Sequence, residues 1–168
     1  DSVFVDIARI DPYDFQAKGK AKRWQPARYV AWITPAADQG DVAIVDLGTA
    51  ESIEKAVQTA REAIEASQSP KGVMQQRGER FAEEQLRVEL QALADLIWKP
   101  LADKLGDAKR IVLSPDAALW LVPWGALPVS PDRLLIEQYV LEHVVSGRDI
   151  VAATKVGEKA KTNPPVIF

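Results

Sequence analysis

Few side chains in this 168-residue sequence could perform acid–base or nucleophilic chemistry, and the most suggestive group lies near its end. His143, Ser146 and Asp149 stand close together, and a serine, a histidine base and an orienting acid are the parts of a hydrolase triad. However, the run from Val140 to Val145 predicts a strand, in which positions 143 and 146 point to opposite faces. The nucleophile-elbow pattern is also absent. We therefore expect His143 to be a packed or rim residue, and the same argument applies to Glu142.

Other common chemistries lack their residues. The sequence contains no cysteine, which excludes thiolate catalysis, thiolate metal ligation and disulfides within this chain. Neither the dinucleotide-binding fingerprint nor the phosphate-binding loop is present. Asp11 and Asp14 are close in sequence, but they lack the glycine and the spaced oxygen ligands of a calcium loop. The sequence thus predicts no catalytic, cofactor-binding or metal-ligating residue, and no cofactor.

Charge and hydropathy restrict the partners. Lysine and arginine number 21 against 24 acidic residues, a net charge of −3, which argues against general binding to nucleic acid. No apolar run approaches the length of a membrane span, and the acidic start is unlike a signal peptide. We expect neither nucleic acid nor a membrane as a partner, and the lack of cysteine favours a cytoplasmic location. Because the sequence begins at Asp1, we also expect it to be a piece of a longer or processed protein.

The first half of the sequence alternates as strands do and then changes to a helical period. Ser2–Ile10 predicts a strand, and an exposed loop follows from Asp11 to Pro26. Its cations, expected to be solvated, are Lys18, Lys20, Lys22 and Arg23. Arg28–Thr34 and Val42–Leu47 predict an antiparallel hairpin. A helix should follow Thr49, its candidate N-cap, with one apolar face formed by Ile53, Ala56, Val57, Ala60, Ala63 and Ile64.

The second half adds helices and further strands. We expect a flexible connector from Ser67 to Gly78, a helix over Glu79–Trp98 that restarts or kinks at Pro100, and a segment end at Gly106. The remaining expectations are a buried parallel strand at Lys109–Leu113, one bent or two short strands over Leu134–Val145, a helix from Asp149 to about Ala153 capped by Ser146, a polar linker at Lys155–Pro165, and the start of a strand at Val166–Phe168. This order predicts an α/β layered sheet.

Two local features have a structural and a functional interpretation. Trp32, Trp98 and Trp120 lie in apolar runs and are expected in the core, whereas a ligand cage built from Trp120 and Trp124 is the alternative. Ser114–Asp116 is expected to be a turn whose acid accepts backbone N–H bonds, with a functional loop as the alternative.

Longer stretches resemble a known family. The CHAT domain, a caspase-like module often found with tetratricopeptide repeats in bacterial proteins, resembles I-V-L-S-P-D-A-A-L-W-L-V-P-W-G-A-L at Ile111–Leu127 and L-L-I-E-Q-Y-V-L-E-H-V-V-S-G-R-D-I at Leu134–Ile150. Its opening hairpin and the helix before its S-P-D strand resemble Arg28–Gly48 and Leu93–Leu101. The resemblance covers roughly residues 28–168. The family commonly has glycine where Ala117 stands, so we expect that turn to differ slightly.

The resemblance implies a caspase-like layered sheet with flanking helices, incomplete at the C-terminus, together with an N-terminal strand and hairpin. It divides the chain into an N-terminal strand and loop at residues 1–27 and the N-terminal part of a CHAT-like domain at residues 28–168. The family's catalytic histidine and cysteine follow later strands, and nothing in this sequence matches either motif.

We therefore expect the scaffold half of a cysteine peptidase-like protein, inactive alone, with the catalytic pair outside this chain. A non-catalytic protein-interaction module is the alternative. The expected partners are the missing C-terminal half of the domain or another protein chain, with self-association through an open sheet edge.

Overall fold

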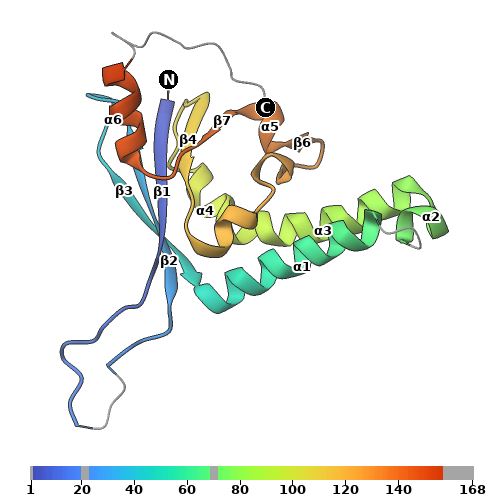
Figure 1. Cartoon of the computed structure of the whole chain (residues 1–168), viewed down its shortest axis with the longest axis horizontal. Helices are drawn as coiled ribbons and strands as arrows, with labels where there is room; N and C mark the ends of the chain where they lie inside the picture. Colours follow the sequence, from blue (N-terminus) through green and yellow to red (C-terminus); the bar gives the residue numbers. More distant parts are fainter. Residues whose placement is uncertain (1, 20–22, 69–71, 157–168) are drawn as a thin grey trace, which may run out of the picture.

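The computed structural model describes residues 2–19, 23–68 and 72–156, and its centre is a five-stranded mixed sheet (Figure 1). In spatial order the strands are β3 (Ala43–Thr49), β2 (Arg28–Pro35), β1 (Ser2–Ile10), β4 (Arg110–Ser114) and β7 (Val140–His143). β1, β4 and β7 run parallel, whereas β2 is antiparallel to both of its neighbours. The predicted α/β sheet with flanking helices is confirmed, and it is consistent with a caspase-like layered fold.

The alternation of β1 places its two sets of side chains on opposite faces of the sheet. Val3, Val5 and Ile7 are buried, while the residues between them are partly exposed. Val5 pairs with the buried Ile33 on one side and with the buried Leu113 on the other. β1 is therefore a central strand, and its buried side faces the core.

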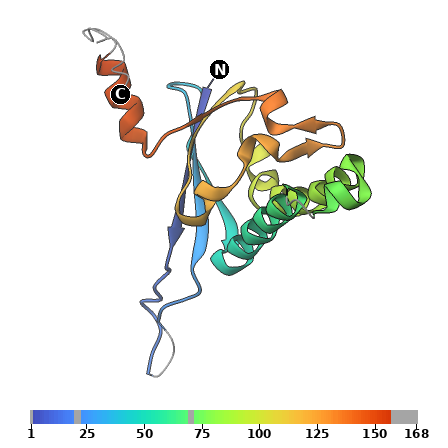
Figure 2. The same cartoon turned by 45° about the vertical axis from the view of Figure 1, so that its right-hand side comes forward.

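Two long helices cover the buried face of the sheet. α1 (Ala50–Gln68) and α3 (Glu79–Ile97) lie side by side, whereas α6 (Gly147–Val156) lies on the opposite side (Figures 1 and 2). Ile53 from α1 and Leu93 and Ile97 from α3 are fully buried. The apolar period predicted both long helices correctly, because their apolar stripes are what the sheet buries.

The described part of the connector before α3 is partly helical, where the sequence predicted a flexible segment. It contains the short helix α2 (Val73–Arg77), whose first turn begins with hydrogen bonds from the N–H groups of Gln75 and Gln76 to the Gly72 carbonyl, at 3.1 and 3.2 Å. Gly78 then adopts a φ of +89°, which separates α2 from α3. The predicted restart at Pro100 is confirmed, since α4 (Lys99–Ala102) begins directly after Trp98.

The chain between β4 and β7 differs most from expectation. It contains two 3-10 turns, η1 (Ala117–Leu121) and η2 (Trp124–Ala126), a small hairpin of β5 (Pro128–Ser130) and β6 (Arg133–Leu134), and α5 (Leu135–Gln138). Of the one bent or two short strands predicted over residues 134–145, β7 forms at Val140–His143, but the residues from Leu135 to Gln138 are helical. A helical turn forms there because Glu137 Oε2 accepts the Leu134 N–H at 2.7 Å and Leu135 is fully buried.

The final described element starts earlier than predicted. α6 begins at Gly147 rather than near Asp149, and it includes Lys155, which the sequence predicts to be part of the linker. The rest of that linker and the predicted strand at Val166–Phe168 lie outside the described residues. Within the described ranges, no helix combines the length and the apolar character needed to cross a bilayer.

Candidate functional site

The parallel strands β1, β4 and β7 end at one edge of the sheet, which we call the carboxyl edge. In open α/β sheets, ligands bind at the carboxyl ends of parallel strands. Arg9 near the end of β1, Asp116 after β4 and His143 at the end of β7 all belong to this edge. It is therefore the first place to look for chemistry.

Asp116 joins β1 to the turn that follows β4. Its Oδ2 accepts the backbone N–H of Arg9 at 2.9 Å, and its Oδ1 accepts the N–H of Ala117 at 2.8 Å. The expectation that Asp116 accepts backbone N–H groups is confirmed, although Ser114 is still the last residue of β4. Ala117 has a φ of +47°, a left-handed conformation that favours glycine. Asp116 thus fixes the position where η1 starts.

A second group of polar side chains lies where β1, β2 and α1 meet. Arg9 Nε donates to Glu54 Oε1 at 3.0 Å, and the Tyr29 hydroxyl donates to the same oxygen at 3.3 Å. The hydrogen bond to Glu54 raises the pKa of Arg9, and burial raises the pKa of Tyr29. Arg9 is therefore a fixed cation and Tyr29 a neutral hydroxyl at physiological pH.

The outer rim of the carboxyl edge is apolar and aromatic. Trp120 is 45% exposed, Leu121 is 51% exposed, and the Trp120 ring centroid lies 6.5 Å from that of His143. Leu121 also lines a groove of about 360 Å³ between η1 and α1, whose lining includes Glu54 but neither Trp120 nor His143. The groove and the Trp120–His143 pair are therefore separate features of this rim, both bordered by η1.

The expectation that Trp120 is a core residue is wrong, because η1 turns its side chain toward solvent. Trp124 is instead buried, and its Nε1–H donates to the Leu119 carbonyl at 3.0 Å. Trp98 is buried as predicted, and Trp32 is half-buried. The alternative cage of Trp120 and Trp124 does not form, since one ring is at the surface and the other in the core.

The apparent triad of His143, Ser146 and Asp149 is not assembled. Asp149 Oδ2 accepts the backbone N–H groups of Val145 at 3.1 Å and Ser146 at 3.0 Å, so this carboxylate organises the turn before α6. His143 is exposed at the rim as expected, and its recorded ring contact is with Trp120. Within the described part of the chain, no hydrogen bond joins the three side chains.

The carboxylates considered for calcium make other contacts. Asp14 Oδ1 accepts the backbone N–H groups of Gln16 and Ala17, and Asp11 Oδ1 lies 3.4 Å from Arg9 Nη1. Among the residues that the structure describes, no three histidine, aspartate or glutamate side chains gather as metal ligands.

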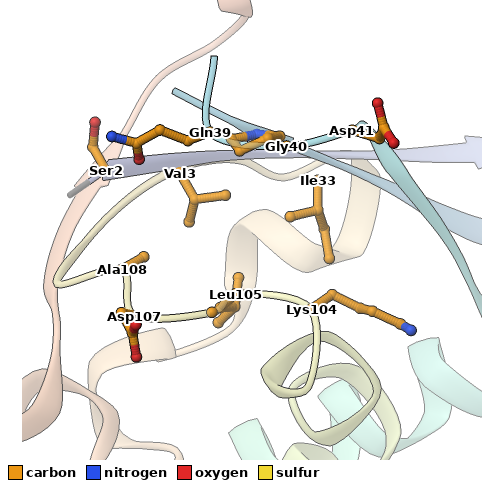
Figure 3. A pocket seen from close by; sticks show the side chains of 12 residues that line it. Ser2, Val3, Ile33, Gln39, Gly40, Asp41, Lys104, Leu105, Asp107 and Ala108 are labelled. Carbon is orange, nitrogen blue, oxygen red and sulfur yellow. The ribbon is translucent and has the colours of Figure 1, made fainter. Parts of the chain in front are cut away.

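A larger cavity, of about 480 Å³, lies at the opposite end of the sheet, beside the start of β1 (Figure 3). Val3 and Ile33 point from the sheet toward Leu105, and all three side chains are buried. The side chains of Asp41 and Asp107 point away from the cavity, so neither carboxylate is directed into it (Figure 3). The carboxyl edge, where charged groups converge, is the better candidate site.

Sequence reasoning missed Arg9, Tyr29 and Glu54 as partners. Arg9 lies 45 positions from Glu54 and 107 from Asp116, so no local spacing signals their proximity. The exposure of Trp120 was also missed, because an apolar run without clear periodicity does not show which member faces solvent.

Comparison with known protein families relates the second half of the chain to one of them. A family model described as the CHAT domain matches residues 87–167, from within α3 onward. The predicted resemblance to the CHAT domain is confirmed over these residues, and it relates them to a caspase-like, peptidase-related family; residues 28–86 lie outside the match. No curated protein and no solved structure matches the chain.

Proposed function

Starting from the CHAT-domain match over residues 87–167, we propose that this chain is the scaffold half of a CHAT-domain cysteine peptidase-like protein. The sheet and the carboxyl edge form one wall of a peptide-binding cleft. The histidine base and the cysteine nucleophile come from polypeptide outside these 168 residues. The observation that carries the proposal is the ordered carboxyl edge itself, in a sequence without cysteine.

The requirements of cysteine peptidase chemistry support a catalytic pair that lies outside this chain. Peptide-bond attack by a cysteine peptidase requires a thiolate and a base within hydrogen-bond reach of it. The sequence has one histidine, His143, and its ring lies beside Trp120 rather than beside a nucleophile. Arg9 and Asp116 are held by hydrogen bonds to one another and to the neighbouring backbone, which suits a role in positioning.

The sheet also offers a place for the remaining strands. β7 stands at one end of the strand order, and its register is parallel to β4. A further parallel strand added beside β7 would end next to His143 at the carboxyl edge. Groups that follow such a strand would face Trp120 across the cleft.

The alternative is a non-catalytic module that binds a protein partner. The exposed side chains of Trp120 and Leu121 favour it, since aromatic residues are enriched at protein interfaces. The two functions differ in whether a thiol is needed.

The test compares this chain with the polypeptide encoded by its complete reading frame, using a mixture of fluorogenic peptides. We expect no hydrolysis by the 168-residue chain and hydrolysis by the complete polypeptide that iodoacetamide abolishes. Trp120→Ala in the complete polypeptide should lower hydrolysis about tenfold, mainly through KM. Turnover by this chain alone would overturn the proposal, and a complete polypeptide without thiol-dependent turnover would favour the interaction module.

A further inference from the structure

The small hairpin of β5 and β6 lies against α3, and between them is a pocket of about 380 Å³, which we call the hairpin pocket. Its walls come from α3, η2, the hairpin and α5. β6, α5 and α3 all lie on one side of the sheet (Figures 1 and 2). The lining contains no residue of the carboxyl edge, so the hairpin pocket is a separate feature of the molecule.

The floor of the hairpin pocket is apolar. Leu90 and Pro128 are buried there, while Leu86, Ala126 and Leu134 are half-buried and remain in contact with solvent. A concave space of roughly a few hundred cubic ångströms lined by apolar side chains can enclose an apolar group of another molecule. The hairpin pocket therefore offers a binding position for one large aliphatic or aromatic side chain.

Arg87 fixes the two walls of the pocket relative to one another. Its Nη2 donates to the Ser130 carbonyl at 3.2 Å and also to the Pro131 carbonyl, 43 and 44 positions later in the sequence. These bonds hold the turn of the hairpin on α3. The pocket thus exists before any partner binds, and a preformed site loses little conformational entropy on binding.

Carboxylates surround the apolar floor. Glu83, Asp132 and Glu137 line the pocket, and all three residues are exposed. In the described part of the chain, the carboxylates of Glu83 and Asp132 make no hydrogen bond or ion pair. Glu137 accepts the Leu134 N–H through Oε2 at 2.7 Å, and its Oε1 has no partner among the described residues. The rim is therefore acidic and ready to receive a cation.

The cations near the pocket do not neutralise its rim. Arg87 is the one cation of the lining, and its Nη2 is already bound to carbonyl oxygens. Arg80 in α3 lies 3.4 Å from Glu84, and neither of these residues lines the pocket. Arg133 precedes Leu134 in β6, so the alternation of a strand directs it to the opposite face of the hairpin. Three carboxylates against one committed cation leave an excess of negative charge.

We propose that the hairpin pocket binds a segment of a partner protein in which a large apolar side chain has lysine or arginine beside it. The apolar side chain packs on the floor, and the cation faces the carboxylates of Glu83 and Asp132. This binding goes beyond the proposed function, since it involves neither the carboxyl edge nor a thiol.

The charge of the rim selects against other large partners. Nucleic acids and anionic lipid surfaces bring negative charges that these carboxylates repel. An acidic peptide meets the same repulsion, and an uncharged apolar segment would cover carboxylates without pairing them, which costs free energy. A segment that combines an apolar side chain with a cation is the best complement to the pocket.

The test measures binding of a short fluorescein-labelled peptide of leucine, lysine and serine to the whole chain by anisotropy. In a second peptide glutamate replaces lysine, and in a third serine replaces leucine. We expect the leucine–lysine peptide to bind most tightly. Ala126→Leu, which fills the floor, should weaken its binding about tenfold, and Glu83→Lys should weaken it about fivefold at low salt.

Two matched variants control for general effects. Glu51→Lys reverses an exposed charge on α1, and Val88→Leu enlarges a side chain that is 65% exposed on α3 and does not line the pocket; neither should change binding. Circular dichroism verifies that each variant is folded. Glu83→Lys changes an exposed side chain, so it tests the proposal even where Ala126→Leu disturbs the packing.

Three results would overturn the proposal. The leucine–lysine peptide does not bind, either altered peptide binds as tightly, or a control variant weakens binding as much as the pocket variants do. Each of them leaves the thiol-dependent assay of the complete polypeptide unaffected.

Discussion

Single residues at the carboxyl edge connect parts of the chain that are far apart in sequence. The Asp116 carboxylate holds the last residues of β1 and the start of η1 through two backbone N–H groups. Directly after it, Ala117 adopts a conformation that costs an L-residue about 1–2 kcal/mol. The strain is tolerated because the bonds on either side of it fix the turn.

Ala117→Gly should therefore stabilise the protein. Glycine relieves the left-handed strain but loses more conformational entropy on folding, so we expect a net gain of about 0.5–1 kcal/mol in the free energy of unfolding. Urea denaturation measures it. Ala118→Gly, at the next position of η1 where φ is negative, is the matched control and should destabilise. Equal effects of the two substitutions would show that Ala117 is not strained.

The turn itself could be anticipated from its serine, proline and aspartate, because short polar side chains accept bonds from the backbone nearby. The partners of Arg9 could not be anticipated. Its contact with Glu54 depends on the way α1 returns across the sheet, and a single sequence does not encode that path in any local pattern.

At the level of elements, the alternation of apolar residues predicted β1, and the apolar faces predicted α1 and α3. α5 and η1 were not predicted, since each is a single turn. Their conformations depend on one buried leucine, Leu135 or Leu119, and on a local hydrogen bond. Such short segments carry too few residues for a period to be visible.

The contact between β1 and α6 can be tested by substitution. A Cβ at Gly147 would lie 3.1 Å from Phe4 Cε1, so Gly147→Ala should lower the free energy of unfolding by about 1 kcal/mol. In a Phe4→Ala background the same change should be neutral or stabilising, because the obstructing ring is gone. A double-mutant cycle in urea gives the coupling. Additive effects would mean that α6 does not approach Phe4.

The β2–β3 hairpin should lose stability in acid. The ion pair between Arg28 and Asp46, together with the Gly48 N–H, lowers the pKa of Asp46 below 3.8. A folded-state pKa below the unfolded value stabilises the fold above the unfolded pKa, and this contribution disappears as pH falls through the folded one.

Asp46→Asn should accordingly cost less than about 1 kcal/mol at neutral pH, because the pair is exposed, and progressively less below pH 3.8. Denaturation of both proteins across this pH range provides the comparison. A cost that stays constant down to the lowest pH would contradict the assigned ion pair.

On the scale of the whole molecule, the described sheet ends in β3 on one side and β7 on the other. β7 is short, and its Val140 is 53% exposed. An edge strand presents unpaired backbone groups that can pair with another chain.

We expect concentration-dependent self-association through β7. Val140→Lys should reduce it, since a charge on an edge strand opposes pairing. Ile44→Lys places the same charge on β3, where the side chain is 67% exposed, and should have little effect. Light scattering over a concentration series distinguishes the two edges. A wild-type protein that stays monomeric at high concentration would remove β7 as an association surface.

We propose that the carboxyl edge forms one wall of a cleft whose reacting groups lie outside these 168 residues. The most direct measurement places a photo-crosslinking amino acid at Trp120 in the polypeptide encoded by the complete reading frame and maps the products by mass spectrometry. We predict crosslinks to a segment outside this chain that contains a cysteine, with none to that segment from the same probe at Val88. Crosslinks from position 120 that fall only within the 168 residues would contradict the account.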